Sequence, residues 1–235
     1  MAVGHYWRTL DDQATKQKER GGDDVDTGHR GAVTGGKQMW GFCKLVSELL
    51  QENGLAASHI HLDTKLDLPG YYRASKTWDM LVVHDGELVA AVEFKSQRGP
   101  SFGNNFNNRS EEAIGTGVDL WTAYREEAFG KKAPRPFLGW LMLLENCPKS
   151  RSPVRPKASH FDVFPEFRGA SYAKRYELLL RRLVLERLYD GAAFLMATER
   201  EGPRGRFTEP AEDLTVRGLL AGIIGHVGAQ VARRR

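Results

Sequence analysis

Two short apolar segments joined by Asp85-Gly86 constrain the fold of this chain more than any other feature. Residues 78–83 and 88–94 are rich in valine, leucine and aromatic side chains, which is typical of β-strands. An Asp-Gly pair between two such segments is a strong signal for a tight β-hairpin. The sequence therefore predicts an antiparallel hairpin inside a larger sheet.

Hydrophobic spacing predicts the remaining elements. Three segments show the three-and-four spacing or the capping residues of amphipathic helices, and these predicted helices cover residues 39–53, 110–129 and 171–189. Three more segments alternate or are continuously apolar over strand length, and these predicted strands cover residues 60–68, 137–144 and 192–198. The resulting αβββαβ order, followed by a further helix and strand, predicts an α/β fold with a mixed central sheet flanked by helices.

Two segments show no hydrophobic period. Residues 1–38 are polar and are expected to form an N-terminal arm or loop with no core of its own: residues 5–20 are compatible with a helix that has few apolar residues, and residues 21–38, with six glycines, have no periodic pattern. Residues 96–109 are rich in asparagine and are expected to form a loop after the second hairpin strand. Residues 39–235 are then expected to form a single domain.

Composition excludes several classes of protein. The longest apolar run, residues 137–144, has eight residues, far fewer than the ~20 that span a bilayer. The amino terminus has no apolar stretch of the kind found in a secretory signal, and the two cysteines are far apart, without metal-binding or disulfide spacing. We therefore expect a cytoplasmic protein with no membrane partner.

Charge is distributed unevenly along the chain. The formal net charge is +4, yet residues 149–235 carry 17 Lys and Arg against 10 Asp and Glu. A polyanion such as nucleic acid is a natural partner for a basic C-terminal third, although solvation of the surface would also account for this excess.

Three charged residues on the predicted hairpin indicate its chemistry. Asp79 lies near the start of the first strand, and Glu93 and Lys95 lie at the end of the second. Side chains two residues apart share one face of a strand, so Glu93 and Lys95 emerge together while Phe94 points away. Two converging carboxylates suit Mg²⁺, and a lysine beside them stabilises charge on a scissile phosphate.

The turn decides whether Asp79 joins this pair. A two-residue turn would place Asp79 opposite Val92 and leave Glu93 on the other face. A three-residue loop, residues 84–86, would place Asp79 opposite Ala91, with Glu93 as its diagonal neighbour on the same face. We therefore predict the three-residue loop.

Asp79 together with Glu93-Phe94-Lys95 resembles the signature of the PD-(D/E)XK nucleases, whose core has the same αβββαβ order. The segments WDMLVV, LVAAVEFKSQ, GPSFGNNFNNR and EEAIGTGVDLWTAYREEAFG, with RGAVTGGK upstream, are similar to the XhoI family of type II restriction endonucleases. This resemblance implies a Mg²⁺-dependent homodimer that cuts double-stranded DNA at CTCGAG with 5′ overhangs, alongside a cognate DNA methyltransferase. It also implies that Asp79, Glu93 and Phe94 hold the metal and that Lys95 assists the attacking water.

Other residues are candidates around this site. Glu48, on the polar side of the first predicted helix, is a candidate for an extra carboxylate, the alternative being a surface glutamate. Asparagine and glutamine bond adenine, and arginine bonds guanine, so we expect DNA contacts after the catalytic strand and in the glycine-rich segment. The candidate DNA-binding residues are Arg30, Lys37, Gln97, Arg98, Asn104, Asn105, Asn107, Asn108 and Arg109.

Two alternatives remain open on the sequence, and a third is not expected. A repair or junction-resolving nuclease of the same fold would share the catalytic residues, and a non-catalytic DNA-binding module would keep the fold without turnover. Residues 31–37 match part of a phosphate-binding P-loop, but Gln38 replaces its Ser or Thr and no buried strand precedes it. A P-loop nucleotidase is therefore not expected.

Overall fold

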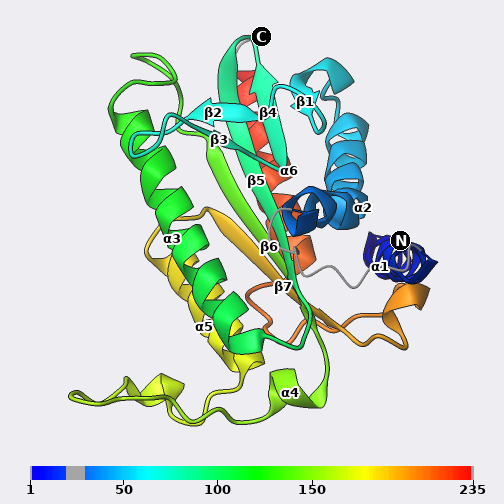
Figure 1. Cartoon of the computed structure of the whole chain (residues 1–235). Helices are drawn as coiled ribbons and strands as arrows, with labels where there is room; N and C mark the ends of the chain where they lie inside the picture. Colours follow the sequence, from blue (N-terminus) through cyan, green and yellow to red (C-terminus); the bar gives the residue numbers. More distant parts are fainter. Residues whose placement is uncertain (1, 20–29, 234–235) are drawn as a thin grey trace.

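A five-stranded mixed sheet forms the centre of the computed structural model, which describes the backbone of residues 2–19 and 30–233 and the side chains of residues 2–10 and 38–233 (Figure 1). In their order across the sheet, the strands are β1 (Ile60–His61), β4 (Met80–His84), β5 (Glu87–Gln97), β6 (Phe137–Glu145) and β7 (Gly191–Ala197). The pairs β1–β4 and β4–β5 are antiparallel, whereas β5–β6 and β6–β7 are parallel. The predicted mixed central sheet flanked by helices is confirmed.

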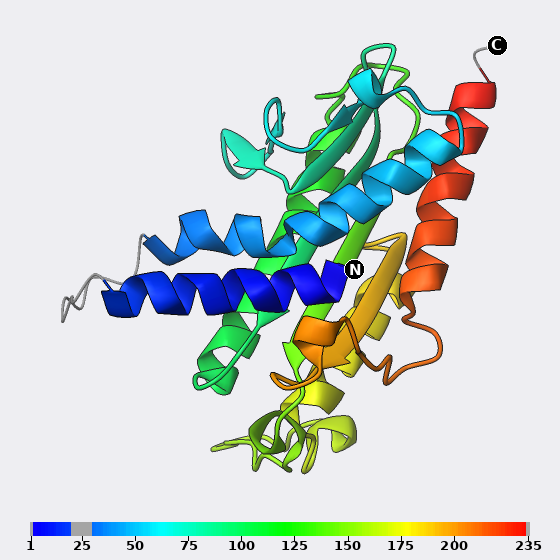
Figure 2. The same ribbon diagram turned by 90° about the vertical axis from the view of Figure 1, so that its right-hand side faces the viewer.

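Helices cover both faces of this sheet (Figures 1 and 2). One face carries α3 (Phe102–Arg125) and α5 (Tyr172–Leu185), and the other carries α1 (Ala2–Glu19), α2 (Arg30–Glu52) and α6 (Val216–Ala232). Because β6 lies in the interior of the sheet and is covered on both faces, residues 137–144 are all buried. This explains their continuous apolar run.

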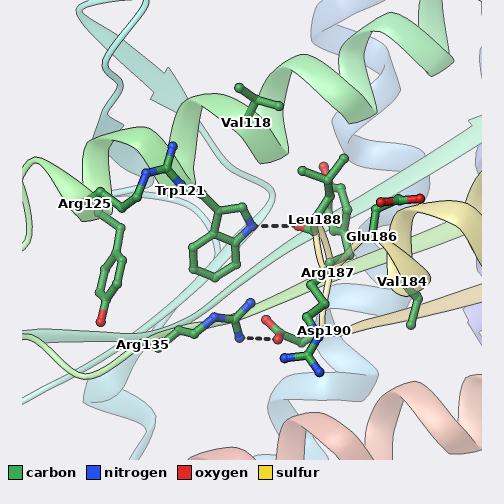
Figure 3. A pocket seen from close by; sticks show the side chains of 11 residues that line it. Val118, Trp121, Arg125, Arg135, Val184, Glu186, Arg187, Leu188 and Asp190 are labelled. Atoms are coloured by element: carbon green, nitrogen blue, oxygen red, sulfur yellow. Dashed lines mark hydrogen bonds and ion pairs between the residues drawn. The ribbon is translucent and has the colours of Figure 1, made fainter.

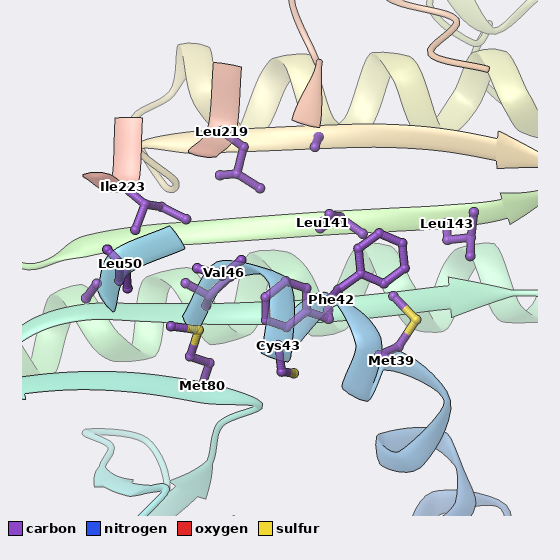
Figure 4. Close-up of a cluster of buried hydrophobic side chains, with 14 of the residues drawn as sticks. Met39, Phe42, Cys43, Val46, Leu50, Met80, Leu141, Leu143, Leu219 and Ile223 are labelled. Carbon is purple, nitrogen blue, oxygen red and sulfur yellow. The ribbon is translucent and has the colours of Figure 1, made fainter. Parts of the chain in front are cut away.

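The core on the face of α2 and α6 is shown in Figure 4. Phe42 and Val46 of α2, Leu219 and Ile223 of α6 and Leu141 of β6 belong to this one buried cluster. Helix α6 was not predicted from the sequence. Its buried residues Leu219, Ile223 and Val227 recur every four residues, the spacing of a helix that packs one face on a core.

The N-terminal segment does not match the predicted arm. Residues 30–38 belong to α2, so the loop expected there is wrong, and α1 buries Val3, Tyr6 and Trp7 in the same core cluster as α2. A mostly polar helix can still be held by a few large side chains, because each contributes about 1.5–3 kcal/mol when buried. The N-terminal helix therefore completes the core on this face of the sheet.

The turn of the central hairpin also differs from the prediction. Asp85 and Gly86 have φ of 51° and 77°, the left-handed values of a type I′ turn. His84 pairs with Glu87, so the turn has two residues and the predicted three-residue loop is wrong. The local preference of Asp-Gly for a tight turn therefore prevails at this position.

A β-bulge restores the register that the site needs. Val83 pairs with Leu88, but Val82 pairs with Ala90, so β5 contributes one extra residue at this point. Beyond a bulge, the side chains of the strand with the extra residue change faces relative to those of the partner strand. The bulge thus places Asp79 and Glu93 on one face, as the predicted longer loop was expected to do, but Ala91 pairs with Leu81, so the predicted pairing of Asp79 with Ala91 is wrong.

The predicted strand over residues 60–68 is wrong in its length. Only β1 joins the sheet, where it forms the edge beside β4. The alternation that continues through Leu66 and Leu68 leads into a separate antiparallel hairpin, built from β2 (Asp67–Pro69) and β3 (Ser75–Thr77). Figure 1 shows this small hairpin reaching from the sheet toward α3.

The loop predicted over residues 96–109 is also largely wrong. β5 continues to Gln97, and α3 begins at Phe102. Phe102 and Phe106 anchor this first part of α3, because their rings lie 5.7 Å from Tyr172 and 5.0 Å from Tyr176 of α5. Aromatic packing between helices therefore outweighs the weak helix propensity of asparagine.

Short helices complete the described chain: η1 (Ala57–His59), α4 (Pro148–Arg151), η2 (Pro165–Phe167) and η3 (Gly202–Arg204). None of the helices in the described part of the chain is long and apolar enough to cross a membrane.

Candidate active site

Strand alternation on β5 places two charged side chains under α3. Ala91 packs in the core beneath α3 and α5, while Val92 and Phe94 pack in the core beneath α2. Phe94 stacks on Phe42 of α2, with ring centroids 6.5 Å apart. By the same alternation Glu93 and Lys95 share the face covered by α3, and their position on one face opposite to Phe94 agrees with the prediction.

Asp79 joins them from the residue before β4. Met80 pairs with Val92, so continuing this register by one residue places Asp79 opposite Glu93. Its Oδ2 accepts a hydrogen bond from the backbone N–H of Phe94 at 2.8 Å and lies 3.4 Å from Nζ of Lys95. The hairpin thus brings the three predicted catalytic side chains together.

Glu93 lies at the centre of the group and is fully buried, with 0% of its surface exposed. Its two oxygens form ion pairs with two different lysines: Oε2 with Lys95, and Oε1 with Lys76 of β3 at 2.5 Å. Burial raises the pKa of Glu93 above its ordinary value, and the two ammonium groups oppose that shift. Lys76 was not singled out in the sequence, because it lies on a separate hairpin.

A third carboxylate comes from α3. Glu112 lies 3.3 Å from Nζ of Lys95 and also pairs with Arg109, one turn earlier on the helix. Burial acts to raise the pKa of Glu112, but Lys95 and Arg109 together lower it below its ordinary value. Glu112 was not among the residues predicted from the sequence: it lies within the helix predicted over residues 110–129, but the sequence does not show that this part of the helix packs beside Lys95.

We call Asp79, Glu93, Glu112, Lys76 and Lys95 the acid–lysine cluster. Burial alone would lower the pKa of Lys95, yet its three carboxylate neighbours raise it well above the ordinary range. The Lys95 ammonium therefore stays charged and acts as a fixed cation between the acids. Such a group stabilises negative charge on a reacting phosphate.

The donor set of the cluster fits a hard divalent cation. Asp79 and Glu93 offer carboxylate oxygens on the same face of the hairpin, and Mg²⁺ is commonly bound by one or two carboxylates together with water and phosphate oxygens. Phe94 has an apolar side chain, so only its backbone carbonyl oxygen could contribute. Among the described side chains, no three His, Cys, Asp or Glu residues are grouped as ligands around one metal position. This agrees with the lysine ammonium groups, which contact both oxygens of Glu93.

Glu48 does not take part in this cluster. Its side chain is half exposed on α2 and lies 3.6 Å from Lys44, one turn earlier on the same helix. The additional carboxylate in the structure comes from α3 instead. The surface-glutamate interpretation of Glu48 therefore agrees with the structure.

One predicted DNA-binding residue has a structural role. Gln97 is buried, its amide donates to the backbone oxygen of Phe102 at 3.0 Å, and its carbonyl accepts from the hydroxyl of Tyr176. Both ends of this side chain are occupied inside the core. The prediction that Gln97 reads a base is therefore wrong.

The other candidates have different positions. Asn104, Asn107 and Asn108 are exposed and Asn105 is half-buried, all on the first turns of α3. Arg98 pairs with Glu199 at 2.5 Å, and Arg109 contacts Glu112 within the site. The side chains of Arg30 and Lys37 lie outside the described ones, although both residues belong to α2.

A buried carboxylate fastens the β2–β3 hairpin beside the site. Asp119 of α3 accepts from the backbone N–H groups of Tyr71 and Tyr72 at 2.7 and 2.8 Å and from Nε of Arg73 at 2.7 Å. Hydrogen bonds from these three residues lower the pKa of Asp119 despite the opposing effect of burial. A side chain on Gly70 would collide with this carboxylate, because its Cβ would lie 2.5 Å from Oδ2. The hairpin that carries Lys76 is therefore held in place at its turn.

Two hollows flank this hairpin. One of about 530 Å³ is bordered by Thr77, Trp78 and Asp79, and one of about 260 Å³ is bordered by Arg73 and Glu112. Each hollow is thus bordered by one carboxylate of the acid–lysine cluster, Asp79 or Glu112.

A larger hollow of about 700 Å³ lies elsewhere, between the ends of α3 and α5 (Figure 3). Its side chains are paired with one another: Arg135 lies over the ring of Trp121 at 4.1 Å and pairs with Asp190, while Trp121 donates to the backbone oxygen of Leu188. It contains no residue of the acid–lysine cluster. Convergent charge rather than volume identifies the candidate active site.

Comparison with known proteins agrees with this geometry. The family described as "Restriction endonuclease XhoI" matches residues 16–209. The type II restriction enzyme BstVI of Geobacillus stearothermophilus is 50% identical over 212 residues, which cover 88% of this chain and 94% of that protein. The type II restriction enzyme XhoI of Xanthomonas vasicola is 47% identical over 79% of this chain and 74% of its own length, and AbrI of Azospirillum brasilense is 52% identical over 68% and 71%. No solved structure matches the chain.

Proposed function

The chain belongs to the XhoI restriction endonuclease family and is thus a site-specific deoxyribonuclease, and we propose that it is a Mg²⁺-dependent enzyme of the PD-(D/E)XK type. The observation that carries this proposal is the convergence of Asp79, Glu93 and Lys95 on one face of the central hairpin. The proposed recognition sequence is CTCGAG, cut with 5′ overhangs, as the family resemblance implies. The same resemblance supports a cytoplasmic enzyme that works alongside a cognate DNA methyltransferase.

The roles of the residues follow from their charges and positions. Asp79, Glu93 and the carbonyl of Phe94 would hold the metal ion, which when bound supplies Lewis-acid stabilisation of phosphate oxygens. Lys95 keeps its proton, so its ammonium orients the attacking water by hydrogen bonding and offsets charge that develops on the phosphate. Glu112 acts through Lys95, since its carboxylate lies 3.3 Å from the ammonium and holds it in position.

The exposed start of α3 is the proposed DNA-reading surface. Asn104, Asn107 and Asn108 project from the helix that also carries Glu112, so a duplex that reaches the cluster would lie close to them. A palindromic site is read most simply by a two-fold dimer with one active site per strand. We therefore propose a homodimer on DNA, to be tested by sedimentation of the protein with a cognate duplex.

The test of the function is cleavage of a plasmid of known sequence with Mg²⁺, followed by sequencing of the ends. We expect discrete cuts at one palindrome and none in the presence of a chelator. Glu93→Gln and Lys95→Ala should each lower the cleavage rate by about a hundredfold or more, because each removes a group held at the reacting phosphate. The matched control is Glu48→Gln, which removes a glutamate paired with a lysine outside the cluster and should leave the rate unchanged.

Some results would contradict the proposal. Full activity of Glu93→Gln would refute the assignment of the site. Cleavage directed by DNA shape, with no preferred sequence, would instead favour the repair or junction-resolving nuclease. Specific binding without any Mg²⁺-dependent cleavage would favour a non-catalytic DNA-binding module.

A further inference from the structure

Glu93 is contacted by one more ammonium group than the proposed catalysis requires. Lys95 pairs with one of its oxygens, and Lys76 pairs with the other at 2.5 Å. Only 12% of the Lys76 side chain is exposed, so this contact is part of the interior. Both oxygens of the proposed metal ligand are therefore taken by cations that belong to the protein.

The charges around Glu93 balance without a metal ion. The acid–lysine cluster holds three carboxylates and two ammonium groups, and Arg109 adds a third cation through its pair with Glu112. A divalent cation would leave this group with two excess positive charges, and a DNA phosphate would remove only one of them. Release of one protein cation would restore neutrality, which a buried site with a low effective dielectric strongly favours.

Lys76 is the cation with the weakest attachment. Lys95 contacts three carboxylates, and Arg109 contacts Glu112 one turn away on its own helix. Lys76, among the described residues, pairs with Glu93 alone; its other contacts are the backbone oxygen of Thr77 at 3.0 Å and the face of Trp78. Breaking the ion pair between Lys76 and Glu93 therefore costs less free energy than removing Lys95 from its three carboxylates.

The backbone that carries Lys76 is held in place, so only its side chain would have to move to release the ammonium. Asp119 fastens the turn of the β2–β3 hairpin through three hydrogen bonds, and hollows border the hairpin at Thr77 and at Arg73. The four-carbon stem of a lysine reorients by rotation about its own bonds. A released ammonium would thus remain at the edge of the site.

We propose that Lys76 is a positioning residue that occupies the metal-binding oxygen of Glu93 until a divalent cation displaces it. This inference rests on the proposed metal-dependent function. The ammonium keeps the buried carboxylate paired in the metal-free protein, where an unpaired charge would be costly. After displacement it is available to a DNA phosphate, so metal and DNA favour each other's binding by the same factor.

The first test measures metal affinity directly and without DNA. Isothermal titration with Ca²⁺ should show about tenfold tighter binding to Lys76→Met than to the wild type, because the competing ammonium is gone; tenfold corresponds to about 1.4 kcal/mol. Lys76→Arg restores a cation and should return the affinity to within about twofold of the wild type. Lys44→Met removes a lysine from the exposed pair with Glu48 and should change nothing.

The second test uses the wild-type protein, so it does not depend on the folding of a variant. ¹⁵N NMR of lysine side chains should show the ammonium signal of Lys76 shifting and exchanging faster with water as Ca²⁺ is added, while that of Lys95 remains ordered. An unmoved Lys76 signal at saturating Ca²⁺, or unchanged Ca²⁺ affinity in Lys76→Met, would overturn the placeholder role. If Glu93→Gln binds Ca²⁺ as tightly as the wild type, the proposed metal site itself is wrong, which distinguishes the two failures.

Discussion

Asp119 offers the sharpest test of how the β2–β3 hairpin is held beside the active site. Its side chain is 6% exposed, and it accepts two backbone hydrogen bonds, from Tyr71 and Tyr72, and a third from Arg73. A hydrogen bond to a charged group contributes about 1.5–3 kcal/mol, against about 0.5–1.5 kcal/mol for a neutral one. Arg73 is 44% exposed, so its ion pair adds ~0–1 kcal/mol after solvent screening.

The perturbation is Asp119→Asn, which keeps the shape of the side chain and removes its charge. One amide oxygen still accepts from Tyr71 and Tyr72, while the amide nitrogen faces another donor, Nε of Arg73. We therefore expect the free energy of unfolding to fall by about 2–4 kcal/mol, the difference between two charged and two neutral hydrogen bonds plus the lost ion pair. Equilibrium unfolding in urea at neutral pH measures this loss. Asp162→Asn is the control, because Asp162 is 93% exposed and 3.5 Å from Arg168, and should change stability by less than about 0.5 kcal/mol.

The stability difference between the wild type and Asp119→Asn should also depend on pH, and it should fall in acid. The pKa of Asp119 is lower in the folded protein than in the unfolded chain, so its stabilisation is complete above the ordinary carboxyl pKa and is lost as pH falls through the lowered value. The difference between wild type and Asp119→Asn should therefore shrink below about pH 4. A variant as stable as the wild type at pH 7, or a difference that grows in acid, would refute the reasoning.

Three further substitutions test local packing and hydrogen bonding. A Cβ on Gly202 would lie 2.0 Å from the ring nitrogen of Trp7, so Gly202→Ala should destabilise the protein by about 1–3 kcal/mol in urea unfolding. Gly228→Ala, at a helical glycine where an added Cβ would meet nothing within 4 Å, should instead stabilise the protein by about 0.5–1 kcal/mol. Equal effects of Gly202→Ala and Gly228→Ala would show that the space around each glycine does not govern the effect of adding a Cβ. Tyr176→Phe leaves the buried carbonyl of Gln97 without its donor and should cost about 1–3 kcal/mol by the same measurement. A neutral result at Tyr176 would show that the hydrogen bond contributes nothing net.

Much of the fold follows from local patterns in the sequence. The apolar runs at residues 137–144 and 192–198 become β6 and β7, and the three-and-four spacing over residues 171–189 becomes α5. These elements were predictable because hydrophobic period reports which faces of a segment must be buried, whatever covers them. The shared face of Glu93 and Lys95 is predictable for the same reason.

The elements that the sequence predicted wrongly are those stabilised by contacts with residues far away in the chain. Residues 102–109 have the composition of a loop, yet Phe102 and Phe106 are held by tyrosines of α5. The alternation over residues 60–68 is real, but part of it belongs to a hairpin that does not join the sheet. The composition of a segment does not reveal the free energy that it gains from contacts with elements far away in the chain.

The residues of the candidate active site also divide into those placed by local sequence and those placed by tertiary packing. The hairpin and its charged residues are local, so the sequence alone determines that Asp79 lies at the start of the hairpin and that Glu93 and Lys95 lie on its second strand. The bulge that aligns them, and the arrival of Glu112 from α3 and Lys76 from β3, depend on how the elements pack. A side chain's direction along a strand follows from backbone geometry, but its neighbours across the fold are set only when the hydrophobic faces of sheet and helices are buried together.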